Sequence, residues 1–214
     1  MELNVVQQIA IYALPVVFAI TLHEAAHGYV ARYFGDNTAY MLGRVSLNPL
    51  RHIDPIGTIL LPLLTLFFGG ILFGWAKPVP VNFNQLRNPK KNMLWVALAG
   101  PASNLAMALA WALVMKIANM MPDSALSLPM ALMGRAGITI NAMLMVLNLM
   151  PLPPLDGGRI AVSLLPNRLA YRYAMIEPYG IILLVILLFS GVLGSIMWPL
   201  IDATMTLISL LFGI

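Results

Sequence analysis

Hydrophobic residues occur in long blocks along this chain rather than at the spaced positions of an amphipathic helix. The blocks cover residues 5–34, 56–73, 93–120, 128–150 and 179–214. Several approach the roughly 20 residues that a helix needs to cross a lipid bilayer. The pattern predicts an all-α polytopic membrane protein with about five to six membrane segments. No internal repeat or low-complexity linker divides the chain, so we expect a single membrane-embedded domain over residues 1–214.

Two of the blocks contain residues that break helices. Pro62 and the pair Gly69–Gly70 interrupt block 56–73, and the following sequence GWAKPVPVN alternates proline with valine. That alternation suits extended backbone better than a helix, so a short extended or re-entrant segment is predicted near residues 74–86. In the last block Pro199 is the candidate break, which allows one tilted span with a turn or two short spans.

Composition supports the membrane assignment and excludes other classes. The 214 residues are 60% hydrophobic and 9% charged, with a mean hydropathy of +0.86, whereas soluble domains are about 25% charged. No cysteine is present, which excludes disulfides and thiolate ligands. The twelve basic residues are scattered, so the net charge of +4 indicates an anionic membrane leaflet and not nucleic acid as the partner. The first block has no basic residues before it, so a cleaved signal peptide is not expected.

The positions of the basic residues predict the topology. Three groups favour the cytoplasmic side: Arg32, Arg44 and Arg51; Arg87, Lys90 and Lys91; and Arg159, Arg168 and Arg172. They share one side only if residues 56–86 enter the membrane and return to the side from which they came. Lys116 and Arg135 then lie towards the outer side, where long side chains can reach the interface.

Ionisable residues stand inside the first apolar block, where they are costly and usually functional. His23 and His27 are four residues apart and share one face of a helix. Glu24 lies about 100° around the helix, close enough to reach a metal-bound water without being a ligand. This H-E-x-x-H pattern indicates two zinc ligands and a general base. Buried histidines that only form hydrogen bonds are the alternative, which explains a single histidine better than this pair.

A catalytic zinc ion takes three protein ligands and keeps one position for water. Asp36, His52 and Asp54 fall in the polar stretch after the first block, and Asp123 falls in an outer loop. Asp156 is the stronger candidate, because the prolines of NLMPLPPLDGGR free the backbone from helix and two glycines follow it. The alternative for Asp156 is a helix N-cap.

Depth in the membrane is consistent with this choice. The two histidines precede Arg32 by a few residues, and Asp156 precedes Arg159. The three side chains therefore meet on one side of the membrane if blocks 5–34 and 128–150 run in the same direction.

Three motifs in order resemble the site-2 protease family of intramembrane zinc metalloproteases over most of the chain. They are HEAAH at 23–27, AGPASN at 99–104, and N-x-x-P-x-x-x-x-D-G at Asn148, Pro151, Asp156 and Gly157. The resemblance implies that His23, His27 and Asp156 bind one zinc ion per chain and that Glu24 activates water. It is closest in character to compact prokaryotic members without a PDZ domain, and it implies an in-membrane extended segment, which we match to GWAKPVPVN.

Peptide hydrolysis also needs a donor for the developing oxyanion. Asn148 and Asn104 are the candidates, since each is an amide in an apolar block. The alternative is that both form hydrogen bonds between helices, with Gly100 and Asn104 on a small-residue packing face. Residues 78–81 could pair with an unwound substrate strand, or they could form an ordinary structural hairpin.

The expected activity is intramembrane zinc endopeptidase. The expected partners are the lipid bilayer and a transmembrane protein or signal-peptide substrate, in a prokaryotic plasma membrane with the active site towards the cytoplasm. The alternatives are a metal-handling or transport membrane protein that uses the same histidine pair, and a haem or redox protein. Transporters usually contain paired repeats, which the sequence lacks, and haem ligation would not need Glu24.

Overall fold

The computed structural model describes residues 4–60 and 77–214, and within those residues the protein is helical with no strand. Five of the described helical stretches are long and apolar enough to cross a membrane: Val6–Tyr33, Pro89–Asn119, Ser127–Leu149, Asn167–Phe189 and Val192–Phe212. The predicted all-α polytopic fold is therefore confirmed. The predicted block 56–73 begins with a π-helical turn, and its remainder, residues 61–73, lies outside the described residues.

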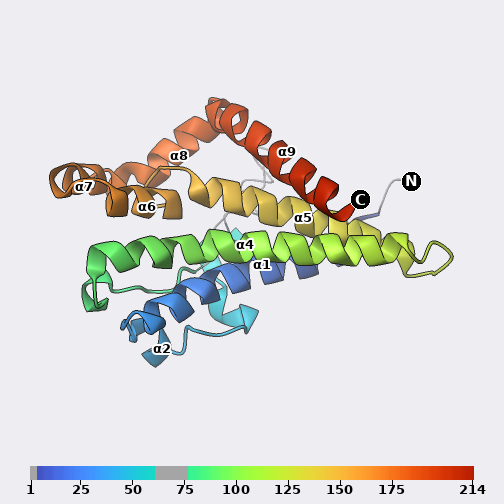
Figure 1. Cartoon of the computed structure of the whole chain (residues 1–214), viewed down its shortest axis with the longest axis horizontal. Helices are drawn as coiled ribbons and strands as arrows, with labels where there is room; N and C mark the ends of the chain where they lie inside the picture. The colour runs from blue at the N-terminus through green and yellow to red at the C-terminus, as the bar shows by residue number, and fades with distance from the viewer. Residues whose placement is uncertain (1–3, 61–76) are drawn as a thin grey trace.

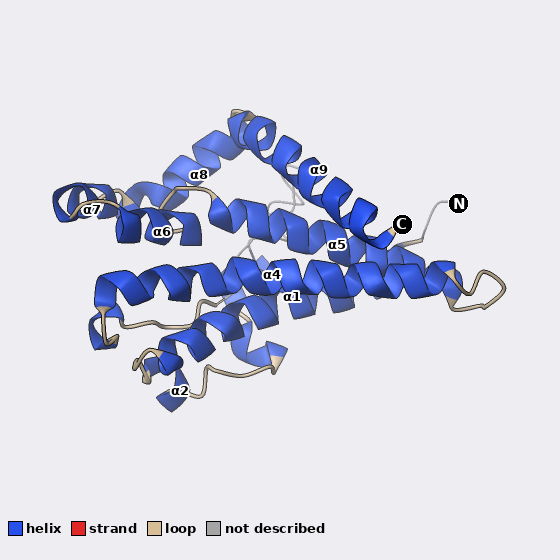
Figure 2. Ribbon diagram, in the orientation of Figure 1, coloured by secondary structure: helices blue, strands red, loops and turns tan. Residues whose placement is uncertain are grey.

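Long helices lie side by side in one layer, and two further helices that meet at an angle pack against this layer (Figures 1 and 2). In chain order they are α1 (Val5–Tyr33), α2 (Thr38–Met41), η1 (Pro49–His52), η2 (Pro55–Leu60), η3 (Phe83–Gln85), α4 (Pro89–Asn119), α5 (Ser127–Leu149), α6 (Asp156–Leu164), α7 (Asn167–Ala174), η4 (Glu177–Tyr179), α8 (Gly180–Phe189) and α9 (Val192–Phe212). α1 packs against both α4 and α5, α6 packs against α4, and α9 packs against α5.

Glycines of α5 allow this helix to pack closely against α4. A Cβ atom added to Gly134 would lie 2.7 Å from the Cβ of Met115, and one added to Gly137 would overlap the indole ring of Trp111. Helices in lipid gain no hydrophobic free energy from associating, so close van der Waals packing of this kind supplies much of the attraction. This contact holds α4 and α5 together, and α1 packs against both of them.

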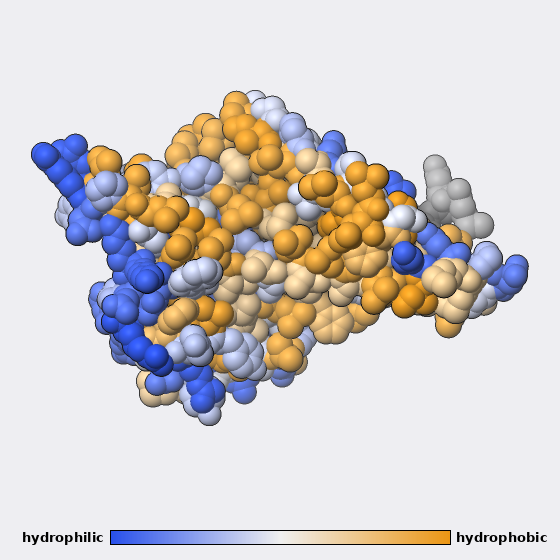
Figure 3. All heavy atoms as spheres, viewed as in Figure 1, coloured by the Kyte–Doolittle hydropathy of each residue, from blue (hydrophilic) through white to orange (hydrophobic). Residues whose placement is uncertain are grey.

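The polar segments gather at one end of the bundle. The Arg87 backbone N–H donates to the Phe34 carbonyl at 2.9 Å, and Lys90 Nζ donates to the Leu165 carbonyl at 2.5 Å. The end of α1, the start of α4 and the end of α6 therefore lie together, where Figure 3 shows many hydrophilic residues on the left; the middle of the body is mainly apolar, and a smaller hydrophilic group lies at the right end. The chain thus returns after residues 56–86 to the end that it left, as the positive charges predicted.

Residues 77–82 form neither helix nor strand, in agreement with the extended segment predicted from their prolines. Residues 83–85 close it with the short helix η3. The first part of the predicted segment, residues 74–76, lies outside the described residues.

The break in the last apolar block is at Gly191, and the prediction of a break at Pro199 is wrong. Gly191 separates α8 from α9 with φ +76°, whereas Pro199 lies inside α9. Glycine adopts this left-handed conformation without steric cost, so it ends a helix readily. A proline removes one backbone hydrogen bond, which membrane helices tolerate. The candidate span before the break also begins earlier than residue 179, at Asn167.

Replacing Gly191 by alanine should lower the stability by about 1 kcal/mol, because the new Cβ meets no atom within 4 Å and only the positive φ opposes it. Gly194→Ala is the matched control, since Gly194 lies within α9 and its Cβ would make ordinary contacts at 3.8 Å. Thermal unfolding of the detergent-solubilised protein compares the two. Equal midpoints for Gly191→Ala and Gly194→Ala would contradict this account of the break.

Candidate metal centre

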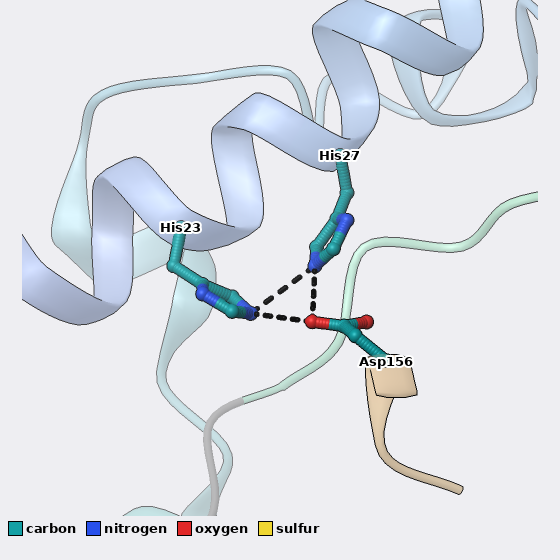
Figure 4. A group of neighbouring side chains, drawn as sticks. All are labelled: His23, His27 and Asp156. Atoms are coloured by element: carbon teal, nitrogen blue, oxygen red, sulfur yellow. Dashed lines mark hydrogen bonds and ion pairs between the residues drawn. The ribbon is translucent and has the colours of Figure 1, made fainter. Parts of the chain in front are cut away.

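Three side chains from distant parts of the chain meet at one point inside the bundle. His23 and His27 project from one face of α1, and Asp156 projects towards them from the first residue of α6 (Figure 4). The two Nε2 atoms are 3.1 Å apart, and each lies 3.3 Å from Asp156 Oδ2. All three residues are buried, and they are the group of potential metal ligands found among the described residues.

Local structure explains how each ligand reaches the site. A four-residue spacing places both imidazoles one helical turn apart on α1. Asp156 follows residues 150–155, which contain no regular structure, and Leu155 is the N-cap of α6. Asp156 is the first residue of α6 and not its N-cap, and its Oδ2 atom lies 3.3 Å from the Nε2 atoms of both histidines, so its carboxylate is directed to them.

Hydrogen bonds on the far side of each ring determine which nitrogen carries the proton. His27 Nδ1 lies 2.7 Å from the carbonyl oxygen of Val96, which can only accept. His23 Nδ1 lies 2.6 Å from Asn104 Oδ1. Both Nδ1 atoms must therefore donate, and in the neutral rings both Nε2 atoms carry lone pairs directed at the site.

Lone pairs that converge at this distance require a positive charge between them. Asp156 Oδ2 is buried without a hydrogen-bond partner of good geometry, and its close neighbours are the two Nε2 atoms. Only a proton or a metal cation relieves such an arrangement. Two imidazole nitrogens and one carboxylate oxygen form a donor set that catalytic zinc sites use, with a fourth position left for water.

The ionisation of Asp156 suits a metal ligand. Burial by itself would raise the pKa of Asp156, but His23 and His27, when their Nε2 atoms carry protons, outweigh it and hold the pKa well below the usual aspartate range, and a metal cation in place of those protons acts in the same direction. The carboxylate is therefore ionised at neutral pH, as metal coordination requires.

Gly100 forms the floor of the site. A Cβ atom on this residue of α4 would collide with His27 Nε2 and would lie 2.5 Å from His23 Cε1 and 2.6 Å from His23 Nε2. The space that Gly100 leaves free by having no side chain is therefore the space to which the Nε2 atoms of His23 and His27 point. The glycine of the AGPASN motif contributes to the site itself as well as to helix packing.

Glu24 makes a contact that its position in the sequence did not reveal. Its Oε2 atom accepts a hydrogen bond from the backbone N–H of Val79 at 2.7 Å. Pro78 and Pro80 have no N–H, so Val79 supplies the one backbone donor in this part of the extended segment. The expected general base is therefore held by the segment expected to receive substrate.

Two further side chains hold the extended segment in place. Asp36, completely buried, accepts hydrogen bonds from the backbone N–H groups of Thr38 at 2.9 Å and Asn82 at 2.7 Å. Arg44 donates to the Lys77 carbonyl at 2.9 Å. No pattern in the sequence indicates these roles, since both residues stand in a polar stretch without a recognisable motif.

The structure places Asn104 differently from the predicted oxyanion donor. Its Nδ2 atom donates to the Ala19 carbonyl at 3.2 Å and to Asn141 Oδ1 at 2.9 Å, so both amide hydrogens are committed. Its oxygen instead accepts from His23. The alternative of an interhelical hydrogen bond is the one observed, and the prediction of an oxyanion donor is not supported.

Asn148 stays a prediction as an oxyanion donor. It is half-buried near the end of α5, and its Nδ2 atom donates to the Leu144 carbonyl of the same helix at 2.9 Å. Within the described residues no hydrogen bond joins it to His23, His27 or Asp156.

His52 lies apart from the three-residue cluster. It is buried at the end of η1, and its Nε2 atom lies 2.9 Å from the carbonyl oxygen of Ser46. Asp36, Asp54 and Asp123, the other candidates for a third ligand, are likewise not part of the group of potential ligands in the described residues.

Comparison with known proteins identifies the family. The chain is 37% identical over 193 residues to "Putative zinc metalloprotease YwhC" of Bacillus subtilis, which covers 89% of this chain and 85% of that protein. It is 32% identical over 183 residues to "Putative zinc metalloprotease Rip2" of Mycolicibacterium smegmatis, and 30% identical over 182 residues to Rip2 of Mycobacterium tuberculosis H37Rv. Each of these two matches covers 83% of this chain and 66% of the relative. No family model matches the chain, and no solved structure matches it significantly.

The identity to YwhC extends over most of both chains, so this protein belongs to the site-2 protease family of zinc metalloproteases. Its membrane-spanning helices and its bacterial relatives indicate an integral membrane protein. The resemblance inferred from the three motifs is confirmed.

Gly100→Ala should abolish metal binding while leaving the helices intact, because the added methyl group would occupy the point where the Nε2 atoms meet. Ala102→Ser is the matched control, since it also adds one atom to α4 but on an exposed face. Elemental analysis of the purified variants measures the zinc content. Wild-type zinc content in Gly100→Ala would show that the metal lies elsewhere.

Proposed function

We propose that this protein is an intramembrane zinc endopeptidase that hydrolyses peptide bonds in or near transmembrane segments of membrane-anchored proteins. The observation that carries the proposal is the convergence of His23 Nε2, His27 Nε2 and Asp156 Oδ2 within 3.3 Å, beside Glu24. The membership of the chain in a family of zinc metalloproteases supports it. One zinc ion per chain would be held by these three residues.

Different residues of this chain have separate roles in the proposed hydrolysis. A bound zinc ion supplies a Lewis acid that polarises the scissile carbonyl and makes water more acidic. Glu24 takes the proton from the attacking water as the carbon–oxygen bond forms, and it delivers that proton to the amide nitrogen as the carbon–nitrogen bond breaks. Val79 keeps one oxygen of Glu24 engaged through its N–H, which restricts the rotation of the carboxylate while the proton moves.

The extended segment is proposed to receive the substrate. A transmembrane helix hides its backbone carbonyls in its own hydrogen bonds, so it must unwind before hydrolysis. An unwound strand can pair with residues 78–81 by strand addition. Side chains of Glu24, Asp36 and Arg44 anchor the segment, and within the described residues no strand pairs with it, which supports this role.

The proposed setting is a bacterial plasma membrane, with the site open towards the cytoplasm and a transmembrane protein or signal peptide as substrate. The cluster lies nearer the end of α1 that carries Arg32, on the side where Arg87 and Lys90 also lie. Positive residues favour the cytoplasmic face. Water for hydrolysis would enter from that side. No nucleic-acid partner is expected.

Glu24→Gln should retain zinc and lose peptide cleavage by about 100-fold or more, because the amide cannot accept the proton of water. Cleavage of a membrane-inserted reporter peptide in proteoliposomes gives the rate, and elemental analysis gives the zinc content. A protein that used the histidine pair for transport would keep its metal flux in this variant. Cleavage at the wild-type rate would eliminate Glu24 as the base.

Val79→Pro should slow cleavage without removing zinc, because proline has no N–H for Glu24 to accept. Val79→Ala is the control, since it keeps the N–H and shortens only the side chain. Val81→Pro should also slow cleavage if a substrate strand pairs with the segment. Unchanged turnover in both proline variants, measured on the same reporter, would dismiss the role of the segment.

A further inference from the structure

Two asparagines lie at the centre of the bundle, beyond the metal ligands. Asn104 of α4 and Asn141 of α5 are each 0% exposed. An amide shielded from water on all sides costs free energy unless its donors and acceptors are satisfied, and in membrane helices such residues usually have a function. Asn141 stands in an apolar block and belongs to none of the three sequence motifs.

A series of hydrogen bonds connects the two amides to His23, and the donor and the acceptor of each bond are defined. Asn141 Nδ2 donates to the Gly137 carbonyl at 2.8 Å, which turns Asn141 Oδ1 towards α4. Asn104 Nδ2 donates to that oxygen at 2.9 Å. Asn104 Oδ1 then faces His23 Nδ1 at 2.6 Å. Every group in this series has one role only, because the series begins at a carbonyl that cannot donate.

We infer that Asn141, acting through Asn104, fixes the tautomer of His23 that leaves Nε2 free to bind the metal. Both asparagines are positioning residues, since neither touches the point where the three ligand atoms meet. This inference rests on the proposed zinc site, and it adds a residue that neither the motifs nor the comparisons indicate.

Asn104 needs a second amide beside it because its own side chain has nearly the same shape in two orientations. The side chain of asparagine can rotate by 180° and exchange its oxygen with its nitrogen. In the reversed orientation Asn104 would donate to His23 Nδ1, so the ring proton would move to Nε2 and block the metal. Asn141 Oδ1 and the Ala19 carbonyl both accept from Asn104 Nδ2, and both oppose the reversal.

His27 provides an internal comparison. Its Nδ1 atom donates to the backbone carbonyl of Val96 at 2.7 Å. A backbone carbonyl in a helix cannot exchange with a donor, so no further residue is needed to fix this ring. Only His23 is oriented by a side chain that has two possible orientations, and only behind that side chain does a second amide follow.

The test compares variants of residue 141 in the full-length protein, purified in detergent. Asn141→Leu is nearly isosteric but removes the oxygen that Asn104 needs, so zinc affinity should fall by about 10- to 100-fold, as for other residues that orient metal ligands. Asn141→Asp should restore affinity close to wild type, because a protonated carboxyl accepts from Asn104 and donates to the Gly137 carbonyl. Competition with a chromophoric chelator measures the affinity.

Two further measurements separate positioning from a general loss of structure. Thr139→Val is the matched control on α5, since the Thr139 hydroxyl donates to the Arg135 carbonyl of its own helix and not to the site; it should bind zinc as the wild type does. The chain has three histidines, so nitrogen NMR of histidine-labelled, chelator-treated protein, recorded at a pH high enough for all three rings to be neutral, can report the tautomer of each ring. The His23 signals should change from the Nδ1–H form in Asn141→Leu, while those of His27 and His52 stay.

The outcomes distinguish this inference from the proposed function. If wild-type protein binds no zinc, the proposed function fails and this inference with it. If the wild type binds zinc and Asn141→Leu binds equally well with an unchanged His23 tautomer, only the role of Asn141 is overturned. If Asn141→Leu does not elute as a single species, Asn141→Ala decides, with the same expected loss of affinity and the same overturning result.

Discussion

The architecture depends on holding three electron-pair donors together inside an apolar bundle. His23 Nε2, His27 Nε2 and Asp156 Oδ2 lie within 3.3 Å of one another, a distance at which they repel without a positive charge between them. Their surroundings resist separation: backbone and amide oxygens hold the far side of each ring, and Gly100 leaves the central space open. The packing of the bundle therefore holds the three atoms in an arrangement that favours a bound cation, and the proposed zinc site follows from this arrangement.

The extended segment connects this centre to the rest of the polar end of the bundle. Carboxylates of Glu24 and Asp36 accept the N–H groups of Val79 and Asn82, so two residues of α1 and its following turn hold the segment near the metal ligands. Side chains thus hold the segment, and no strand pairs with it in the part of the chain that the structure describes. Under the proposed function, the same contact places the base and the substrate-binding strand within one hydrogen-bonded unit.

The membrane setting separates two kinds of polar residue in these helices. Thr139, Ser163 and Thr204 donate to carbonyl oxygens four residues earlier in their own helices, which satisfies each hydroxyl locally. Asn104 and Asn141 connect different helices and end at a metal ligand. In a medium without water to satisfy an amide, such a connection is specific because few alternative partners exist.

The sequence alone determined the helical membrane fold, the return of the chain after residues 56–86 to the end of the bundle that it left, and the three metal-ligand candidates. Hydropathy and positive charge predict the spans because every part of the chain meets the same bilayer. The spacing of His23 and His27 predicts their common face because both residues lie in a single helix. The break at Gly191, the orientation of Asn104 and the part played by Asn141 were decided only by the tertiary structure. The partners of an amide depend on how neighbouring helices are rotated and how closely they pack, and no local pattern in the sequence encodes that rotation.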